Sequence, residues 1–314
     1  MTQISGSLQK QGWLRRIGRN IARYPVLYLM ALPLVTYYLI FHYLPMYGIV
    51  IAFQRYVPTK GIAASAWVGL ANFRDFFADP YFPRLLSNTF LISLYQLVFG
   101  FPVPIIFALL LNEIKNRRFV KVTQTITYMP HFISAIVVCG MLRDFTRSDG
   151  LITEILGRFF GMEQINMLTR KDWFRSIYTV MNIWQEFGWE SVIFFAALAG
   201  IDPALHEAAH VDGAGRFKQV IHISLPGLMP TIVILLILRI GRMLSVGWEK
   251  LILLYNPMTY ETADVISTYV YRRGLLQFEY SYGAAVGLFN SVVNCVLLLS
   301  ANAVSRRINE TSLW

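Results

Sequence analysis

Charged residues are scarce in this chain. Only 15% of its 314 residues are Asp, Glu, Lys or Arg, whereas 55% are hydrophobic. Soluble domains carry about 25% charged residues, so this composition argues against an ordinary soluble enzyme and indicates a multi-span membrane protein.

Acidic residues are fewer than basic residues, and the net charge is +10. The basic residues stand at the edges of apolar segments, which is typical of membrane proteins. We therefore expect no nucleic-acid partner.

Cysteine and phosphate-binding motifs are also scarce or absent. The only two cysteines, Cys139 and Cys295, lie in apolar segments, which argues against a disulfide framework and favours small buried thiols. The sequence contains no G-x-x-x-x-G-K-[ST] phosphate loop. Any ATP chemistry must therefore come from separate subunits.

Long apolar runs, in contrast, are abundant. A membrane-spanning helix needs roughly 20 apolar residues. Six segments qualify, at about 26–53, 86–112, 120–142, 176–200, 226–247 and 281–304. Pro130 and His131 interrupt the third. The sequence therefore predicts an all-α integral membrane protein with six transmembrane helices.

The charges of short loops predict the orientation of these spans. The N-terminal segment, the loop after span two and the C-terminal tail are rich in Lys and Arg, and all three fall on one side of a six-span protein. Such loops stay in the cytoplasm. We therefore expect both termini to be cytoplasmic, together with the loop at 201–225 between spans four and five.

The basic residues 1–25 form a tail in front of the transmembrane domain at 26–314. Trp13, Ile17 and Ile21 recur at helical spacing with arginines between them. This pattern predicts a helix that lies in the membrane interface. A tail that only enforces the topology is the alternative.

The stretch 202–226 fits two incompatible functions, of which the first is a zinc protease. His206, Glu207 and His210 match His-Glu-x-x-His, in which two histidines one helical turn apart bind zinc and the glutamate activates water. In the longer metzincin pattern the third ligand position is Arg216, a cation that cannot bind zinc. The stretch also belongs to a predicted cytoplasmic loop rather than to a span. We therefore treat a membrane zinc metalloprotease as the weaker alternative and predict no metal site.

The second interpretation uses more positions of the same stretch. The sequence gives Glu-Ala-Ala, three residues, Gly, nine residues, and Ile-x-Leu-Pro, at Glu207, Ala208, Ala209, Gly213, Ile223, Leu225 and Pro226. This pattern resembles the docking loop of the permeases of binding-protein-dependent ABC importers. The residues Asp212-Gly213-Ala214 and Phe217 are similar to the maltose-type, carbohydrate-uptake branch.

The residues of this loop also suit a docking helix physically. Asp202 can cap a short helix that has Pro203 at its first position. Ala208 and Ala209 remove bulk, so another protein can approach closely. Gly213 can adopt the left-handed conformation that ends the helix.

The resemblance extends over nearly the whole chain and implies a set of partners. A permease of this family is not an enzyme and lies in the cell membrane of a prokaryote beside a second, related permease. Two cytoplasmic ATPase subunits bind ATP and Mg and accept the docking helices, and Glu207 offers a charge to a basic group there. An extracellular solute-binding protein delivers the sugar. This chain itself is expected to hold no cofactor.

The substrate class is predicted less directly. The stretch from Asn256-Pro257 to Tyr271-Arg272-Arg273-Gly274 looks like the permeases for complex oligosaccharides and polysaccharide breakdown products. We therefore expect an oligosaccharide. An ABC permease for a non-sugar solute and a secondary transporter remain as rivals.

Ionisable groups inside the predicted spans mark a candidate substrate path. Glu186 and Glu190 lie four residues apart in span four, and Arg239 and Arg242 lie three apart in span five. Both pairs fall at similar depth. They face each other or the transport path, or they form a structural ion-pair cluster between the spans. Unpaired arginines would favour an acidic saccharide such as a uronate oligomer.

Other side chains in these spans have the chemistry for sugar recognition. Amides can hydrogen-bond to hydroxyl groups, and aromatic rings can stack on sugar rings, although packing explains such residues as well. The candidates are Asn182, Trp184, Gln185, Trp189, Tyr128, His131, Asn290 and Asn294.

Overall fold

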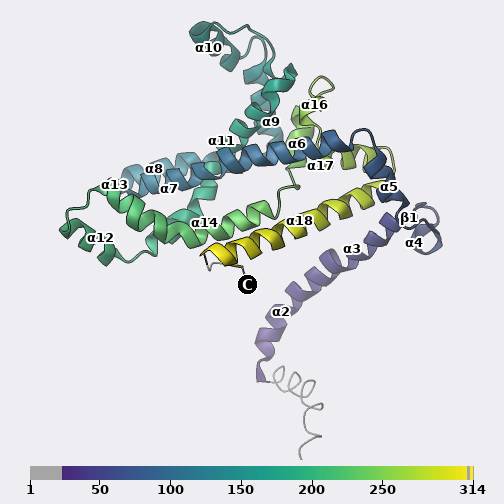
Figure 1. Ribbon diagram of the computed structural model, residues 1–314, viewed down its shortest axis with the longest axis horizontal. Helices are drawn as coiled ribbons and strands as arrows, with labels where there is room; N and C mark the ends of the chain where they lie inside the picture. The colour runs from purple at the N-terminus through teal and green to yellow at the C-terminus, as the bar shows by residue number, and fades with distance from the viewer. Residues whose placement is uncertain (1–22, 310–311, 314) are drawn as a thin grey trace, which may run out of the picture.

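The computed structural model describes residues 23–309 and 312–313, and this part of the chain is predominantly helical (Figure 1). The predicted interfacial helix around Trp13, Ile17 and Ile21 lies outside the described residues and stays a prediction. One departure from an all-α fold is a two-stranded antiparallel sheet, in which β1 (Gln54–Arg55) pairs with β2 (Ala66–Trp67).

Four uninterrupted helical stretches are long and apolar enough to cross a membrane. They are Pro25–Phe53, Phe82–Asn112, Arg216–Ile240 and Tyr280–Arg307. Their elements are α2 (Pro25–Tyr38), η1 (Leu39–Tyr43), α3 (Leu44–Met46) and η2 (Tyr47–Phe53); α6 (Phe82–Tyr95), η3 (Gln96–Gly100) and α7 (Pro102–Asn112); α13 (Arg216–Gln219), η6 (Val220–Ser224) and α14 (Leu225–Ile240); and α18 (Tyr280–Asn309). These stretches match four of the six predicted spans.

Two further helix pairs pass the same test only when their halves are taken together. Arg117–Phe132 and Ala135–Phe160 meet at 97°, and Lys171–Ala199 and Pro203–Val211 meet at 70°. The first pair contains α8 (Arg117–Tyr128), η4 (Met129–Phe132), α9 (Ala135–Thr146) and α10 (Leu151–Phe160); the second is α11 (Lys171–Ala199) and α12 (Pro203–Val211). The described chain thus contains four to six candidate spans.

Prolines shape several of these helices. Of the four π-helical turns in the described residues, three end two positions before a proline: η1 before Pro45, η3 before Pro102 and η6 before Pro226. A proline ring collides with the carbonyl four residues earlier. In all three cases that carbonyl lies within the wider π turn, which lets the helix continue past the proline.

The helix of span five differs from its predicted range of 226–247. It starts ten residues earlier, at Arg216, and α14 ends at Ile240. Residues 241–247 form turns and irregular backbone instead. Gly241 begins this non-helical part, where an added Cβ would lie 2.6 Å from Leu298 Cδ1 of α18.

Helix α11 lies at the centre of the packed part of the molecule, against α7, α8 and α14. Phe194 and Leu198 of α11 share a buried cluster with Ile105, Ala108 and Leu228 of the neighbouring helices. Helix α2, in contrast, has no buried residue and runs away from the other helices (Figure 1).

Short elements connect the long helices. They are α4 (Gly61–Ala64), α5 (Ala71–Ala78), η5 (Met167–Thr169), α15 (Trp248–Leu254), α16 (Tyr260–Ala263), α17 (Ile266–Val270) and η7 (Tyr271–Leu276). Figure 1 places α12 and α13 at the opposite end of the molecule from α5, β1 and α4.

Candidate functional site

A cavity of about 1060 Å³ opens between four parts of the chain. Its walls come from the α6–η3 junction, the middle of α11, the end of α14 and residues 242–250. Pockets for drug-sized ligands typically measure about 300–1,000 Å³. The cavity is therefore large enough for an extended polar solute.

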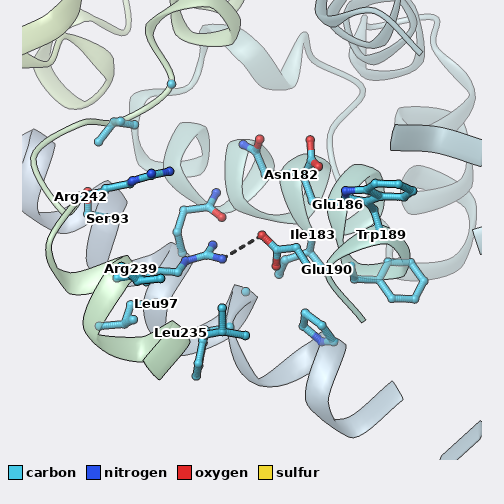
Figure 2. A pocket seen from close by; sticks show the side chains of 18 of the residues that line it. Ser93, Leu97, Asn182, Ile183, Glu186, Trp189, Glu190, Leu235, Arg239 and Arg242 are labelled. Carbon is cyan, nitrogen blue, oxygen red and sulfur yellow. Dashed lines mark hydrogen bonds and ion pairs between the residues drawn. The ribbon is translucent and has the colours of Figure 1, made fainter. Parts of the chain in front are cut away.

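Helix α11 turns a polar face toward this cavity. Asn182, Glu186, Trp189 and Glu190 all line it, together with Arg239 and Arg242 from the span-five region (Figure 2). The spacing of four, three and one residues along α11 places the first four on one side of the helix. The structure thus brings together both predicted charge pairs and two of the other candidates.

Glu190 and Arg239 face each other, which is one of the predicted arrangements. Arg239 Nη1 donates to Glu190 Oε1 at 2.9 Å, as the dashed line in Figure 2 shows. This ion pair joins α11 to α14.

Glu186 is the hub of a second polar cluster. Its Oε2 lies 2.7 Å from His131 Nδ1, and its Oε1 lies 3.3 Å from Lys250 Nζ. Lys250 also donates to Asn182 Oδ1 at 2.8 Å. The His131 ring stacks on Trp189 with centroids 4.8 Å apart. The carboxylate therefore connects the break in span three to α15.

The remaining predicted path residues lie beside the cavity rather than in its lining. Gln185 is buried and donates to the Ile133 carbonyl at 2.9 Å. Tyr128 contacts Trp189 edge to face, with centroids 6.5 Å apart. Asn294 bonds to the backbone and side chain of the 241–247 segment. Asn290 Oδ1 is buried and has no hydrogen-bond partner among the described residues.

Several lining residues were not predicted from the sequence, and three of them are consecutive. Trp248, Glu249 and Lys250 follow the predicted end of span five directly. The Trp248 indole stacks on Tyr271 with centroids 5.3 Å apart and stays 42% exposed. The apolar residues after Lys250 are the signal in the sequence that could have indicated that residues 248–250 lie beside the spans.

The second candidate site is the loop that carries the docking motif. Helix α12 begins as predicted, with Asp202 Oδ1 accepting from the Ala204 N–H at 2.9 Å and Pro203 in the first turn. It ends at Gly213, whose φ is +76°. The Ala214 N–H donates to the Ala209 carbonyl at 2.8 Å, which closes the helix end in the manner of a Schellman motif.

Gln219 holds this loop together. Its Nε2 donates to the Ala214 carbonyl at 2.9 Å, and its Oε1 lies 3.3 Å from His206 Nδ1. Glu207, Ala208, His210 and Asp212 are all exposed. Within the described residues, no group of three or more His, Cys, Asp or Glu side chains is placed to hold a metal.

The surface of the loop is unusually apolar for an exposed segment. Leu205, Val211 and Phe217 are 54%, 87% and 77% exposed. Ile223 and Leu225 are half-buried, whereas Pro226 is exposed; all three lie inside the helical run from Arg216 to Ile240. Exposed apolar side chains around a small-residue helix indicate a surface for a protein partner.

Comparisons with known proteins show that the chain is similar to transport permeases. The family model described as "Binding-protein-dependent transport system inner membrane component" matches residues 100–310, which include both candidate sites. The "Polygalacturonan/rhamnogalacturonan transport system permease protein YteP" of Bacillus subtilis (strain 168) is 44% identical over 300 residues, which are 96% of this chain and 94% of the relative. Protein LplB of the same organism is 45% identical over 289 residues, covering 92% and 91%.

Solved structures show the same likeness in three dimensions. One chain of a bacterial ABC transporter involved in the import of the acidic polysaccharide alginate superimposes with a TM-score of 0.85 at 44% identity, covering 94% of this chain and 99% of that chain. A chain of the bacterial alginate ABC transporter in complex with an alginate pentasaccharide-bound periplasmic protein gives 0.86 at 43% identity, covering 95% and 100%. The chain therefore belongs to the family of binding-protein-dependent transport system inner membrane components, as a multi-pass permease subunit of the ABC importer type in the cell membrane.

Proposed function

We propose that this permease moves an oligosaccharide across the membrane for an ATP-driven importer. The observation that carries the proposal is the cavity, in which Asn182 and charged side chains lie beside the exposed faces of Trp189 and Trp248. Indole faces stack on sugar rings, and amides and charged groups bind hydroxyls. The names of the similar proteins, which refer to polygalacturonan, rhamnogalacturonan and alginate, support the same substrate class.

The proposed topology has six spans with both termini in the cytoplasm. The two bent helix pairs then supply spans three and four, and α12 lies on the cytoplasmic face. The Lys and Arg residues of the loop after α7 support this orientation, because positive loops stay inside. Helix α2, which buries no residue within the chain, is free to contact lipid and a second permease.

The proposed motor is separate from this chain. Two cytoplasmic ATPase subunits bind ATP and Mg, and the α12 loop docks in a cleft of one of them through Glu207, Ala208 and Ala209. The exposure of Leu205, Val211 and Phe217 supports such a contact. An extracellular binding protein delivers the saccharide, as the structure with a pentasaccharide-bound periplasmic protein suggests by likeness.

Transport then follows from a two-state switch. ATP binding closes the ATPase pair and moves α12, and the spans rock between inward-open and outward-open forms. Each ligand favours the state to which it binds more tightly. Because α12 follows α11 after a short break, its movement is transmitted directly to the helix that carries the polar face of the cavity.

Reconstitution tests the function. The permease, its partner permease and the ATPase subunits are reconstituted in proteoliposomes. A candidate binding protein and a defined mixture of saccharides are then added. We expect saccharide-dependent ATP hydrolysis and uptake. ATP hydrolysis that no saccharide stimulates, but that another solute class does, would contradict the proposal.

A further inference from the structure

The backbone between α14 and α15 is not helical, although it lies among the candidate spans. Residues 241–247 form turns and irregular structure, and five of the seven, all but Gly241 and Leu244, line the cavity. Within a membrane, non-helical backbone is tolerated only where protein buries it or where it lines a polar cavity. Interrupted helices of this kind mark substrate sites in other transporters.

Side chains from four different helices fix this segment in place. Asn294 of α18 accepts from the Leu244 N–H at 3.0 Å and donates to Ser245 Oγ at 2.8 Å. The other hydrogen bonds run from Ser93 of α6 to the Met243 carbonyl, from Ser267 of α17 to the Val246 carbonyl and from Tyr178 of α11 to the Gly247 carbonyl. These hydrogen bonds therefore fix the backbone of the segment and the positions of the side chains on it.

Arg242 is the cation of this segment. Its side chain is exposed and lines the cavity, and Figure 2 shows it near Arg239 and Ser93. Arg239 and Lys250, the other two cations of the lining, are bound to Glu190 and Glu186. No acidic or hydrogen-bonding partner of the Arg242 guanidinium is found among the described residues. The structure thus separates the two arginines that the sequence could not distinguish.

One acidic residue of the lining, Glu249, also has no partner of this kind among the described residues. It is exposed in the first turn of α15, where the positive end of the helix dipole stabilises a carboxylate. Arg242 follows the end of α14 in the same way, at the negative end of that helix dipole, which favours a cation but supplies no hydrogen-bond acceptor to the guanidinium. A planar guanidinium with free donors is suited to bidentate binding of a carboxylate.

We propose that Arg242 binds a carboxylate of the transported saccharide, and hence that the substrate is an acidic, uronate-containing oligosaccharide. This inference rests on the proposed function and names the substrate class for the same cavity. The rigid segment holds the guanidinium toward the cavity, and the exposed indoles of Trp189 and Trp248 line the same space for the sugar rings. The paired residues Arg239 and Glu190 hold α11 against α14 and do not bind the ligand.

The test compares an acidic ligand with its neutral derivative. The complete transporter in nanodiscs is titrated with trigalacturonate and with its trimethyl ester, and binding is measured by calorimetry beside saccharide-stimulated ATP hydrolysis. The wild type is expected to bind the acid more tightly than the ester. Arg242→Gln should weaken binding of the acid about ten- to hundred-fold, the range for a hydrogen-bonded charge, and leave binding of the ester unchanged.

Three control variants sharpen the result. Arg242→Lys keeps the charge but not the planar fork, so it should recover part of the affinity for the acid. Glu249→Gln should leave binding of the acid unchanged or strengthen it. Arg239→Gln, which removes the paired arginine, should affect the acid and the ester alike.

Two outcomes would overturn the inference. In the first outcome, the acid and the ester stimulate ATP hydrolysis by the wild type equally, and the Arg242→Gln variant gives the same result. The other is an equal loss for acid and ester in Arg242→Gln, which would mean a structural role. Both leave saccharide transport itself intact, whereas absence of stimulation by any saccharide would instead contradict the proposed function.

Discussion

At the scale of single residues, the charges around the cavity divide into paired and unpaired groups. Glu190 is bound to Arg239, and Glu186 is bound to His131 and Lys250. A charge in a membrane is expensive unless it is paired or faces water. Glu190, Arg239, Glu186 and Lys250, together with His131, are therefore structural contacts at the cavity wall. Arg242 remains as the cation that is free to bind a ligand.

Glu207 in the α12 loop gives the first residue-scale prediction. Glu207→Ala should preserve folding, since this side chain is exposed, but should uncouple ATP hydrolysis from transport because the docking contact loses its charge. The measurement is the ratio of saccharide uptake to ATP hydrolysed in proteoliposomes. Glu163→Ala, at another exposed glutamate, is the matched control. Coupled transport at the wild-type ratio in Glu207→Ala would refute the role assigned to this residue.

Asp79 gives a second prediction, which concerns pH. It lies between the first two spans, is 6% exposed and accepts hydrogen bonds from Arg273 at 2.7 Å, from Tyr282 at 3.0 Å and from Tyr269. Burial raises the pKa of this carboxyl, but the hydrogen bonds outweigh it and hold the pKa below its ordinary 3.8. The carboxylate therefore contributes stability above the ordinary value, and this contribution is lost as the pH falls through the lowered pKa.

Thermal unfolding in detergent measures this contribution. At neutral pH, Asp79→Asn should lower Tm, and the difference from the wild type should shrink as the pH is brought below 3.8. Asp75→Asn, at an exposed aspartate of the same connection, should change Tm little at either pH. A difference that stays constant across the acid range would show that Asp79 does not stabilise the fold as an anion.

At the scale of elements, α8 and α11 approach each other closely at a glycine. A Cβ at Gly188 would lie 2.0 Å from the Thr127 carbonyl oxygen, so the two backbones touch where glycine leaves room. Small residues allow such close approach in membrane proteins. One helical turn away, Gln185 and Glu186 hold the break in span three through Ile133 and His131. The break is thus fixed on α11 by contacts on both sides.

Replacing this glycine is expected to separate the helices. Gly188→Ala should destabilise the protein by about 1–3 kcal/mol, the usual cost of overpacking, because rigid backbone atoms must move. Gly140→Ala in α9 is the matched control, since nothing lies within 4 Å of a Cβ at that position. Tm in detergent reports both variants. Equal Tm values for the two would mean that the α8–α11 contact is looser than the structure shows.

At the scale of the whole molecule, the arrangement of the two candidate sites supports the proposed mechanism. The α12 loop lies at one end of the molecule (Figure 1), and the cavity is lined by residues 182–196 of α11. A short break after Ala199 separates α11 from α12. In the proposed mechanism, movement imposed on the loop by an ATPase would pass this break and reach the cavity along α11.

The topology gives the prediction at this scale. In a variant with Cys139 and Cys295 replaced by alanine, Asp212→Cys should react with a membrane-impermeant maleimide only when the cytoplasmic side is accessible. Thr59→Cys, in the loop between the first two spans, should react from the outside of intact cells. Both positions are exposed. Labelling of both from the same side would contradict six spans with cytoplasmic termini.

Local patterns in the sequence were sufficient for several features. Four candidate spans follow from apolar length alone, and the cap at Asp202 and the left-handed end at Gly213 follow from the conformational preferences of those residues. The interruption at Pro130 and His131 was also predicted, and the facing of Glu190 and Arg239 was one of the alternatives left open. These features depend on interactions within a few residues, or on the simple cost of placing charge in a membrane.

Other features were decided only by tertiary structure. The predicted span continues through residues 241–247, yet the helix stops at Ile240 and side chains of four other helices hold the irregular backbone there. Whether Arg239 or Arg242 is paired depends on which of them lies within reach of Glu190, and this distance is set by helix packing. The sequence by itself therefore determined the membrane class and the two ends of α12, while packing across distant segments decided which charge faces the cavity.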